Sequence, residues 1–74
     1  MLGRMSESNI PNLRKLREAR GLTQVDVGDL LGKASRTILR WESGEQDPSL
    51  TDLRNIARVF NVSVAYLIGE EEAR

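Results

Sequence analysis

Apolar residues recur three and four positions apart along most of the chain, which is the spacing of one face of an α-helix. The alternation of apolar and polar residues that marks a half-buried strand is limited to residues 62–64. Prolines, glycines and capping residues divide the helical pattern into five segments. The sequence therefore predicts an all-α fold, with helices over residues 10–20, 23–31, 34–43, 50–60 and 64–68.

The predicted helix ends carry residue types with a known capping role. Asparagine, serine and threonine accept hydrogen bonds from the free N–H groups of a first turn, and proline fits that turn because it lacks an N–H. Asp52 lies three residues after a predicted N-cap serine, which is the spacing of a capping box. Glycines follow four predicted helix ends, at positions 21, 32, 44 and 69. The predicted N-caps are Asn9, Thr23, Ser49 and Ser63, with Pro11 in the first turn of the first helix.

The second and third predicted helices are separated by only about three residues, beginning with Gly32. Two short helices joined so closely form a helix-turn-helix, and five such helices predict a compact bundle around one core. Gly28 lies inside the second helix, where glycine costs about 1 kcal/mol relative to alanine, so we expect another helix to cross closely there. The residues expected to face inward are Ile10, Leu13, Leu16, Val27, Leu30, Leu31, Ile38, Trp41, Leu50, Leu53, Ile56, Ala57 and Phe60.

Composition narrows the chemistry that the chain can perform. Its 74 residues include no cysteine and no histidine, which excludes disulfides and zinc sites of the Cys/His type. The commonest general base and the thiol nucleophile are missing as well, and we expect no catalytic role, no cofactor and no metal. No apolar run approaches the roughly 20 residues of a membrane span, which favours a soluble cytoplasmic protein.

The formal net charge of zero conceals a difference between the two halves of the chain. Residues 1–40 contain eight basic and four acidic side chains, and residues 41–74 contain three basic and seven acidic ones, so the halves carry +4 and −4. A basic half is compatible with a polyanionic partner, although ordinary scatter of surface charge is the favoured explanation of this fact alone. We expect a flexible leader over 1–8, a folded domain over 9–69 and an acidic tail over 70–74.

Five short motifs occur in order along the chain: GLTQ (21–24), LLG (30–32), TILRWESG (37–44), DPSL (47–50) and NVSVAYLIG (61–69). Together with their spacing, they resemble the Cro/CI-type helix-turn-helix family of phage repressors and bacterial regulators. The resemblance covers most of the chain and implies a five-helix bundle. It also implies a transcriptional regulator, expected to be a repressor, that binds a palindromic site in double-stranded DNA as a homodimer on the nucleoid.

The resemblance assigns roles to residues of the predicted helix-turn-helix, about 23–43. In this family the second helix of the motif enters the major groove, where each base pair presents its own pattern of donors, acceptors and methyl groups. Arginine can form a bidentate pair with guanine, and a helix N-terminus can bind phosphate. The matched base-reading positions are Ala34, Ser35, Arg36 and Arg40, and the matched backbone-contacting positions are Thr23, Gln24, Thr37 and Ser43.

Two further sets of positions follow from the resemblance. Arg17 and Glu42 match a partly buried salt bridge that ties the first helix to the end of the recognition helix. The last predicted helix contributes the expected dimer interface, which we interpret as an exposed apolar patch. That patch consists of Val64, Tyr66 and Ile68.

The chain also departs from the family pattern. Lys33 occupies a turn position that is usually apolar, so either its stem covers the gap between helices with its head in water, or the register differs by one residue. The loop after the recognition helix carries Glu45 and Asp47, and it is therefore given no role in DNA binding. Leu39 faces outward and is apolar, and it is either a thymine-methyl contact or helix filler.

One alternative function remains open. An antitoxin, or another protein-interaction module, can use the same fold to bind DNA together with a partner protein. Such modules usually carry an added partner-binding segment, and this chain has only a few residues beyond the predicted bundle. The DNA-binding regulator is therefore the first expectation.

Overall fold

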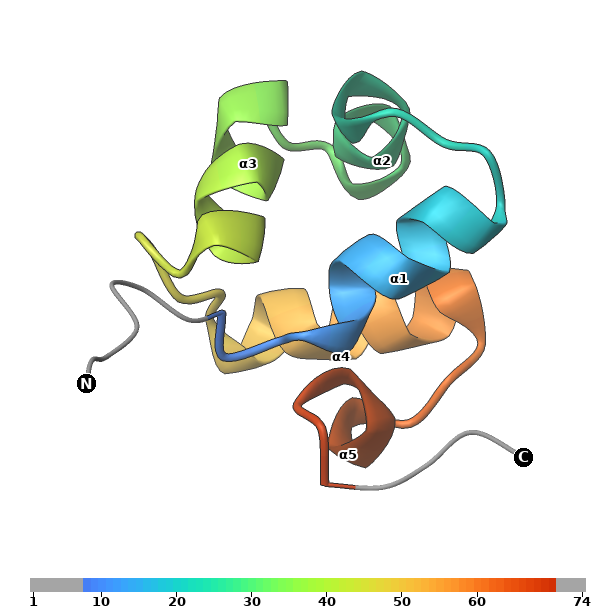
Figure 1. Ribbon diagram of the computed structural model, residues 1–74, viewed down its shortest axis with the longest axis vertical. Coiled ribbons are helices and arrows are strands. Elements are labelled where there is room, and N and C mark those ends of the chain that lie inside the picture. The colour runs from blue at the N-terminus through green and yellow to red at the C-terminus, as the bar shows by residue number, and fades with distance from the viewer. Residues whose placement is uncertain (1–7, 71–74) are drawn as a thin grey trace, which may run out of the picture.

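The computed structural model describes residues 8–70, and these residues form five helices. Figure 1 shows α2 beside α3, with α1 between this pair and α4, and α5 at the opposite end of the bundle. The predicted all-α, five-helix fold is confirmed. The leader expected over 1–8 and the tail expected over 70–74 lie almost wholly outside the described residues. The helices are α1 (Asn12–Ala19), α2 (Gln24–Leu31), α3 (Ser35–Ser43), α4 (Leu50–Phe60) and α5 (Val64–Leu67).

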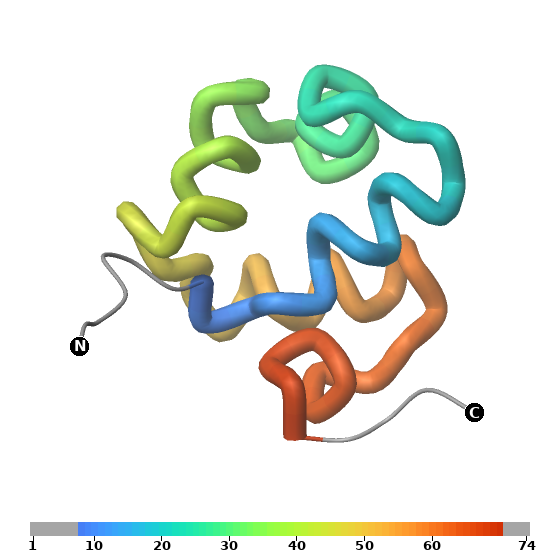
Figure 2. The backbone as a smooth tube through the Cα atoms, viewed as in Figure 1, coloured from blue at the N-terminus to red at the C-terminus, as the bar shows by residue number. Residues whose placement is uncertain are grey.

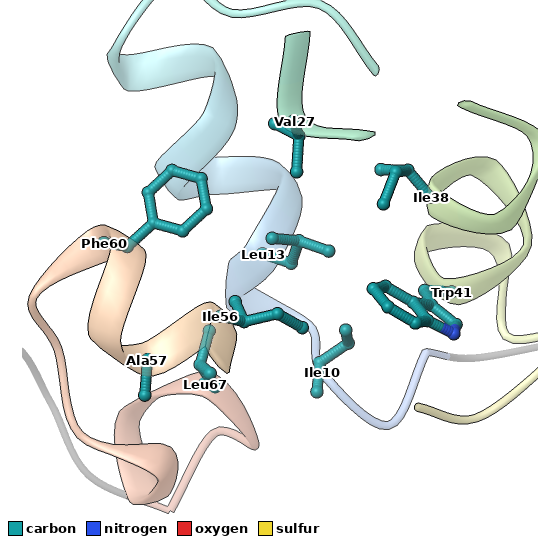
Figure 3. Packing of buried hydrophobic residues seen from close by; sticks show 9 residues of the cluster. All are labelled: Ile10, Leu13, Val27, Ile38, Trp41, Ile56, Ala57, Phe60 and Leu67. Carbon is teal, nitrogen blue, oxygen red and sulfur yellow. The ribbon is translucent and has the colours of Figure 1, made fainter. Parts of the chain in front are cut away.

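Nine buried apolar residues form a single core between the helices (Figure 3). Ile38 and Trp41 project from α3 toward Ile10 and Leu13, and all four are fully enclosed. Every helix contributes at least one residue to this core, and α3 contributes the largest of them. The other members are Val27, Ile56, Ala57, Phe60 and Leu67.

Polar side chains cap three of the five helix starts. Thr23 and Ser49 form complete capping boxes with Asp26 and Asp52, respectively. Ser63 Oγ accepts a hydrogen bond at 2.9 Å from the backbone N–H three residues later. These contacts satisfy N–H groups that have no partner within a helix, and they explain where α2, α4 and α5 begin. The box at Ser49 is predicted from the sequence, whereas the role of Asp26 is not, although its spacing is the same.

The first helix starts later than predicted. It begins at Asn12, with Pro11 in the N-cap position and no side-chain cap. The expected cap, Asn9, instead donates from its amide to Asp47 Oδ1 at 2.6 Å. Figure 2 shows this segment beside the loop that precedes α4. The prediction is wrong because Asn9 finds a partner 38 residues away, which local spacing does not reveal.

Two leucines that were predicted to face the core are exposed, Leu30 at 55% and Leu50 at 58%. In α2 the inward direction lies between Val27 and Gly28, which turns Leu31 toward the core and Leu30 away from it. Leu50 is the first residue of α4 and lies more than one turn before the buried residues of that helix. Both predictions of burial are therefore wrong.

The predicted close approach to Gly28 is present, but the approaching backbone belongs to the turn after α2 and not to another helix. A Cβ atom on Gly28 would collide with the carbonyl oxygen of Lys33. The Lys33 N–H donates to the Gly28 carbonyl at 2.8 Å, and Gly32 between them adopts a left-handed φ of 69°. The turn thus folds back tightly onto α2, and this contact sets where α3 begins.

Candidate nucleic-acid interface

The helix-turn-helix consists of α2, the turn 32–34 and α3. Figure 1 shows α2 nearly end-on and α3 from the side, so the two axes cross steeply. Ala34 is the N-cap of α3 in an extended conformation, and the helix begins at Ser35, one residue later than predicted. Because Ile38 and Trp41 hold one side of α3 in the core, the opposite side faces outward. This outward face of α3 is the candidate interface.

Both arginines that were predicted to read bases lie on the outward face of α3. At about 100° per residue, Arg36, Leu39, Arg40 and Ser43 lie away from the buried edge of the helix. Arg36, Leu39 and Ser43 are exposed, and the side chain of Arg40 is 40% exposed. Of the other predicted contacts on this segment, Ala34 is exposed, and Ser35 and Thr37 are half-buried at the margins.

Arg40 has an acidic neighbour in the loop that follows α3. Its Nε lies 3.7 Å from Glu45 Oε2, in a pair that is open to solvent on both sides. Ser43 Oγ donates to the Arg40 carbonyl at 3.2 Å and accepts from the Glu45 N–H at 3.3 Å, which holds the loop close to the helix end. An exposed pair at this distance contributes little stability. Glu45 therefore competes with an incoming anion for Arg40.

The N-terminus of α2 lies beside the last turn of α3. The N–H of Asp26 donates to Thr23 Oγ1 at 3.0 Å, and the Thr23 N–H donates to the Asp26 carboxylate at 2.8 Å. The hydrogen bonds from the Thr23 backbone and side chain hold the pKa of Asp26 below its ordinary value. Gln24 is half-buried, and its amide donates to Glu42 Oε1 at 3.1 Å. The structure thus places Gln24 directly next to α3.

A partly buried ion pair joins α1 to the end of α3. Arg17 donates through Nε and Nη2 to the two carboxylate oxygens of Glu42, at 2.7 and 3.1 Å. The side chains are 12% and 5% exposed, and Arg17 Nη1 also donates to the carbonyl of Leu22 at 2.9 Å. The hydrogen bond with Glu42 raises the pKa of Arg17. Together with Gln24, the pair forms one network that connects α1, α2 and α3.

Lys33 ties the start of α3 to α4. Its Nζ lies 3.2 Å from Oδ1 of Asp52, in the capping box of α4. Burial alone would raise the pKa of Asp52, but hydrogen bonds from Lys33 and Ser49 outweigh it and keep this pKa below its ordinary value. The register is unchanged, with Gly32 as the left-handed C-cap of α2. The expected one-residue shift of register is therefore absent. The expected lysine head in water is not found either, because the Lys33 ammonium group forms an ion pair with Asp52.

The apolar patch expected on the last helix is not an exposed one. Tyr66 is buried at 9% exposure, and Val64 and Ile68 are half-buried and packed against the core. The expectation is wrong because α5 packs on both α1 and α4, and Asn12 Nδ2 donates to the Tyr66 carbonyl at 2.6 Å. Ile68 still borders a surface depression of about 220 Å³. The depression is also lined by Asn9, Ile10, Asp47, Pro48 and Leu53.

The described part of the chain meets neither the requirements of a metal site nor those of a membrane-spanning helix. Within residues 8–70, no three acidic side chains come together in a way that could hold a metal ion. None of the helices in the same range is long and apolar enough to cross a membrane.

Two short helices that cross steeply and are joined by a tight turn, with the second helix presenting an outward face, define the helix-turn-helix class of domains. A helix-turn-helix family model matches residues 13–67 of this chain. The chain belongs to this family, in its Cro/CI-type branch, as the sequence motifs predicted.

Individual relatives agree with this assignment. The cryptic phage CTXphi transcriptional repressor RstR of Vibrio cholerae is 33% identical over 60 residues, which cover 81% of this chain and 54% of the repressor. The transcriptional activator BcrR of Enterococcus faecalis is also 33% identical over 60 residues, covering 81% of this chain and 29% of the activator. The chain thus spans about half, or less, of these relatives. The P22 c2 repressor, in a complex with a synthetic operator, shares the fold, with a TM-score of 0.78, 21% identity and coverage of 89% of this chain and 100% of that one.

Removing the carboxylate of Glu42 is expected to destabilise the domain strongly. The Glu42→Ala variant removes both close carboxylate oxygens from the Arg17 guanidinium, which is only 12% exposed, and leaves it the more distant carboxylate of Glu18, at 3.9 Å. The free energy of unfolding should therefore fall by about 3–5 kcal/mol. Urea denaturation at pH 7 measures this change. Glu45→Ala is the matched control, because it removes an exposed pair with Arg40 that does not involve Arg17, and it should change stability by less than about 1 kcal/mol. Equal stability of the two variants would contradict the role of the pair of Arg17 with Glu42.

Asp52 is expected to make the stability of the fold sensitive to acid. Because its pKa is lower in the folded state, ionised Asp52 stabilises the fold at pH values above about 4, the pKa of an unfolded aspartate. This contribution is lost as the pH falls through the folded-state pKa. Unfolding free energies measured from pH 7 to pH 2 should show the wild type more stable than Asp52→Asn by roughly 1 kcal/mol at pH 7, with no difference at the acid end. A difference that does not change with pH would refute the assignment.

Proposed function

We propose that this chain is a sequence-specific, double-stranded-DNA-binding transcriptional regulator that acts as a repressor on the nucleoid of the cytoplasm. The observation that carries the proposal is the outward face of α3, where Arg36 and Arg40 lie on a helix that is tied down at both ends. An α-helix of this size fits the major groove of B-DNA. The repressor RstR and the activator BcrR, each 33% identical to this chain, support a role in the regulation of transcription. In this proposal the chain acts by binding alone, without a cofactor, a metal or a catalytic step.

The proposed contacts fall into a base-reading set and a backbone set. The arginines of the base-reading set pair with guanine O6 and N7, and its small residues approach base edges or a thymine methyl. The backbone set binds phosphates and fixes the register of the helix. Gln24 supports this division, because its amide nitrogen gives one hydrogen to Glu42 and keeps a second for a phosphate. The base-reading set is Ala34, Ser35, Arg36 and Arg40, and the backbone set is Thr23, Gln24, Thr37 and Ser43.

A symmetric homodimer is part of the same proposal. Two recognition helices read successive half-sites when they lie about 34–36 Å apart, one turn of DNA. The extents of the chain are 37 × 29 × 24 Å, so two copies side by side can place their α3 helices at this separation. We locate the interface at the depression that Ile68 borders. Pro48, which also lines this depression, lies in the loop that follows α3, so an interface here would keep the two α3 helices close to the contact between the copies. Val64 would lie at its edge, and Tyr66 would support it from the core.

Selection of bound duplexes from a random pool, with the purified chain at about 0.1 M salt, tests the proposal. Enrichment of a palindrome with half-site centres about 10 bp apart is the expected result. Enrichment of a single half-site would keep DNA recognition and reject the dimer. If a chain shown to be folded by circular dichroism enriches no sequence, DNA recognition is rejected, and a search for a protein partner of the antitoxin kind becomes the next experiment.

Substitutions in the two contact sets should have different effects. Arg36→Ala and Arg40→Ala should weaken binding to the selected operator by about 1–3 kcal/mol each and relax base preference at one position per half-site. Gln24→Ala should weaken binding to operator and random duplex by the same factor, because a phosphate contact carries no sequence information. Fluorescence anisotropy titrations with both duplexes measure these effects. If Arg36→Ala weakens both duplexes equally, Arg36 belongs to the backbone set.

Glu45 is expected to oppose DNA binding. The Glu45→Gln variant removes both the competing partner of Arg40 and a negative charge near the DNA, so the operator should bind about two- to fivefold more tightly at 0.05 M salt. The gain should shrink at higher salt. Glu70→Gln makes the same change in net charge and serves as the control, because the Glu70 N–H donates to the Ala65 carbonyl of α5, and α5 lies at the opposite end of the bundle from α3. An unchanged affinity of Glu45→Gln, or equal gains in the two variants, would show that Glu45 does not restrain Arg40.

A further inference from the structure

Leu39 is an apolar side chain in the middle of an otherwise polar surface. It is 48% exposed, although it lies on the same helix as the fully buried Ile38 and Trp41. Its neighbours on the outward face of α3 are Arg36, one turn earlier, and Arg40, the next residue. Leu39 therefore adds little to the core. Its apolar side chain lies on the surface that, in the proposed function, contacts DNA.

The charges around Leu39 are compatible with a polyanion that also presents an apolar group. Leu39 lines a depression of about 210 Å³. The charges of Arg17 and Glu42 compensate each other there through their bidentate pair, and the exposed guanidinium of Arg14 is paired with Glu18 at 3.0 Å. The depression therefore carries no excess of negative charge. Two residues of the lining, Gln24 and Ser43, are proposed phosphate contacts. The lining consists of Arg14, Arg17, Gln24, Leu39, Glu42 and Ser43.

The other exposed leucine of the helix-turn-helix lies beside acidic side chains. Leu30 is 55% exposed on α2, in a depression that it shares with Leu22, Asp26 and Asp29. Two carboxylates beside Leu30 would repel a phosphate backbone. Within the helix-turn-helix, Leu39 is thus the exposed leucine whose charge environment is compatible with DNA.

In the major groove, the apolar group that distinguishes one base from the other three is the 5-methyl of thymine. A half-exposed leucine gains nothing from base donors and acceptors, but it removes water from such a methyl group. We propose that Leu39 is a specificity-determining residue that contacts the 5-methyl group of a thymine in each half-site. This inference rests on the proposed function and adds to it a base preference that the arginines do not supply.

Replacing thymine by deoxyuridine tests the contact, because it removes only the methyl group. Each thymine of the selected operator is replaced in turn, and dissociation constants are measured by fluorescence anisotropy. For the wild type, replacement at one thymine per half-site should weaken binding about fourfold, the equivalent of burying one methylene-sized group. Leu39→Ala should bind the thymine operator about fourfold more weakly than the wild type and should not distinguish thymine from uracil at that position.

Leu30→Ala is the matched control. It truncates an equally exposed leucine outside the outward face of α3, and it should keep the full response to uracil at every position. Thermal melting shows that both variants are folded, which is expected because neither leucine belongs to the core.

Three results would overturn the proposal for Leu39 while leaving DNA recognition intact. They are an operator without thymine in the half-site, a wild type that responds to no uracil replacement, and a uracil response that persists unchanged in Leu39→Ala. A selection that enriches no sequence would overturn the proposed function, and this inference with it, so the two failures are distinguishable.

Discussion

The ion pair between Arg17 and Glu42 secures a helix that is too short to be stable alone in water. It is the contact on which the candidate interface depends most, because it is bidentate and largely shielded from solvent, and through Gln24 it reaches the N-terminus of α2 as well. The opposite end of α3 is held by the pair of Lys33 with Asp52. A helix restrained at both ends and packed along one side presents its outward side chains in one orientation, which readout of base edges requires.

Three of the eight basic residues in the first half of the chain stabilise the fold through contacts with other parts of the molecule. Arg17 and Lys33 are paired with carboxylates, and Arg20 lies 4.9 Å from the centre of a phenylalanine ring and donates to the carbonyl of the same residue. The positive charge that distinguishes this half is therefore largely compensated within the molecule. Arg36 and Arg40 carry it on the outward face of α3. Recognition by this chain must then depend on the geometry of a few side chains more than on a broad basic surface, which agrees with its zero net charge.

Capping residues and apolar spacing predicted the helices well. The features that were missed depend on contacts between residues far apart in the sequence. The helix over 50–60 was predicted to the residue, because Ser49 and Asp52 form a cap within one turn. The burial of Tyr66 and the exposure of Leu30 depend on how whole helices pack against one another. The spacing of apolar residues along a helix does not determine which of two adjacent residues faces the core. The partner of Lys33 lies on another helix, so no spacing rule could identify it. The ion pair of α1 with α3 was predicted from the family resemblance alone, since nothing in the periodicity links the two positions.

Ala34 shows how stability and the proposed function meet at a single position. Hydroxyl side chains cap α2, α4 and α5, whereas α3 has alanine at its N-cap and no side-chain hydrogen bond there. A serine or threonine at this position would stabilise the helix by about 1 kcal/mol. It would also fold its hydroxyl back over the first-turn N–H groups, and a methyl group leaves that end of the helix open to a close approach. Departures from local stability rules are expected where a site needs them. The uncapped start of α3, at a position matched to base reading, is therefore consistent with selection for contact with DNA and not for helix stability.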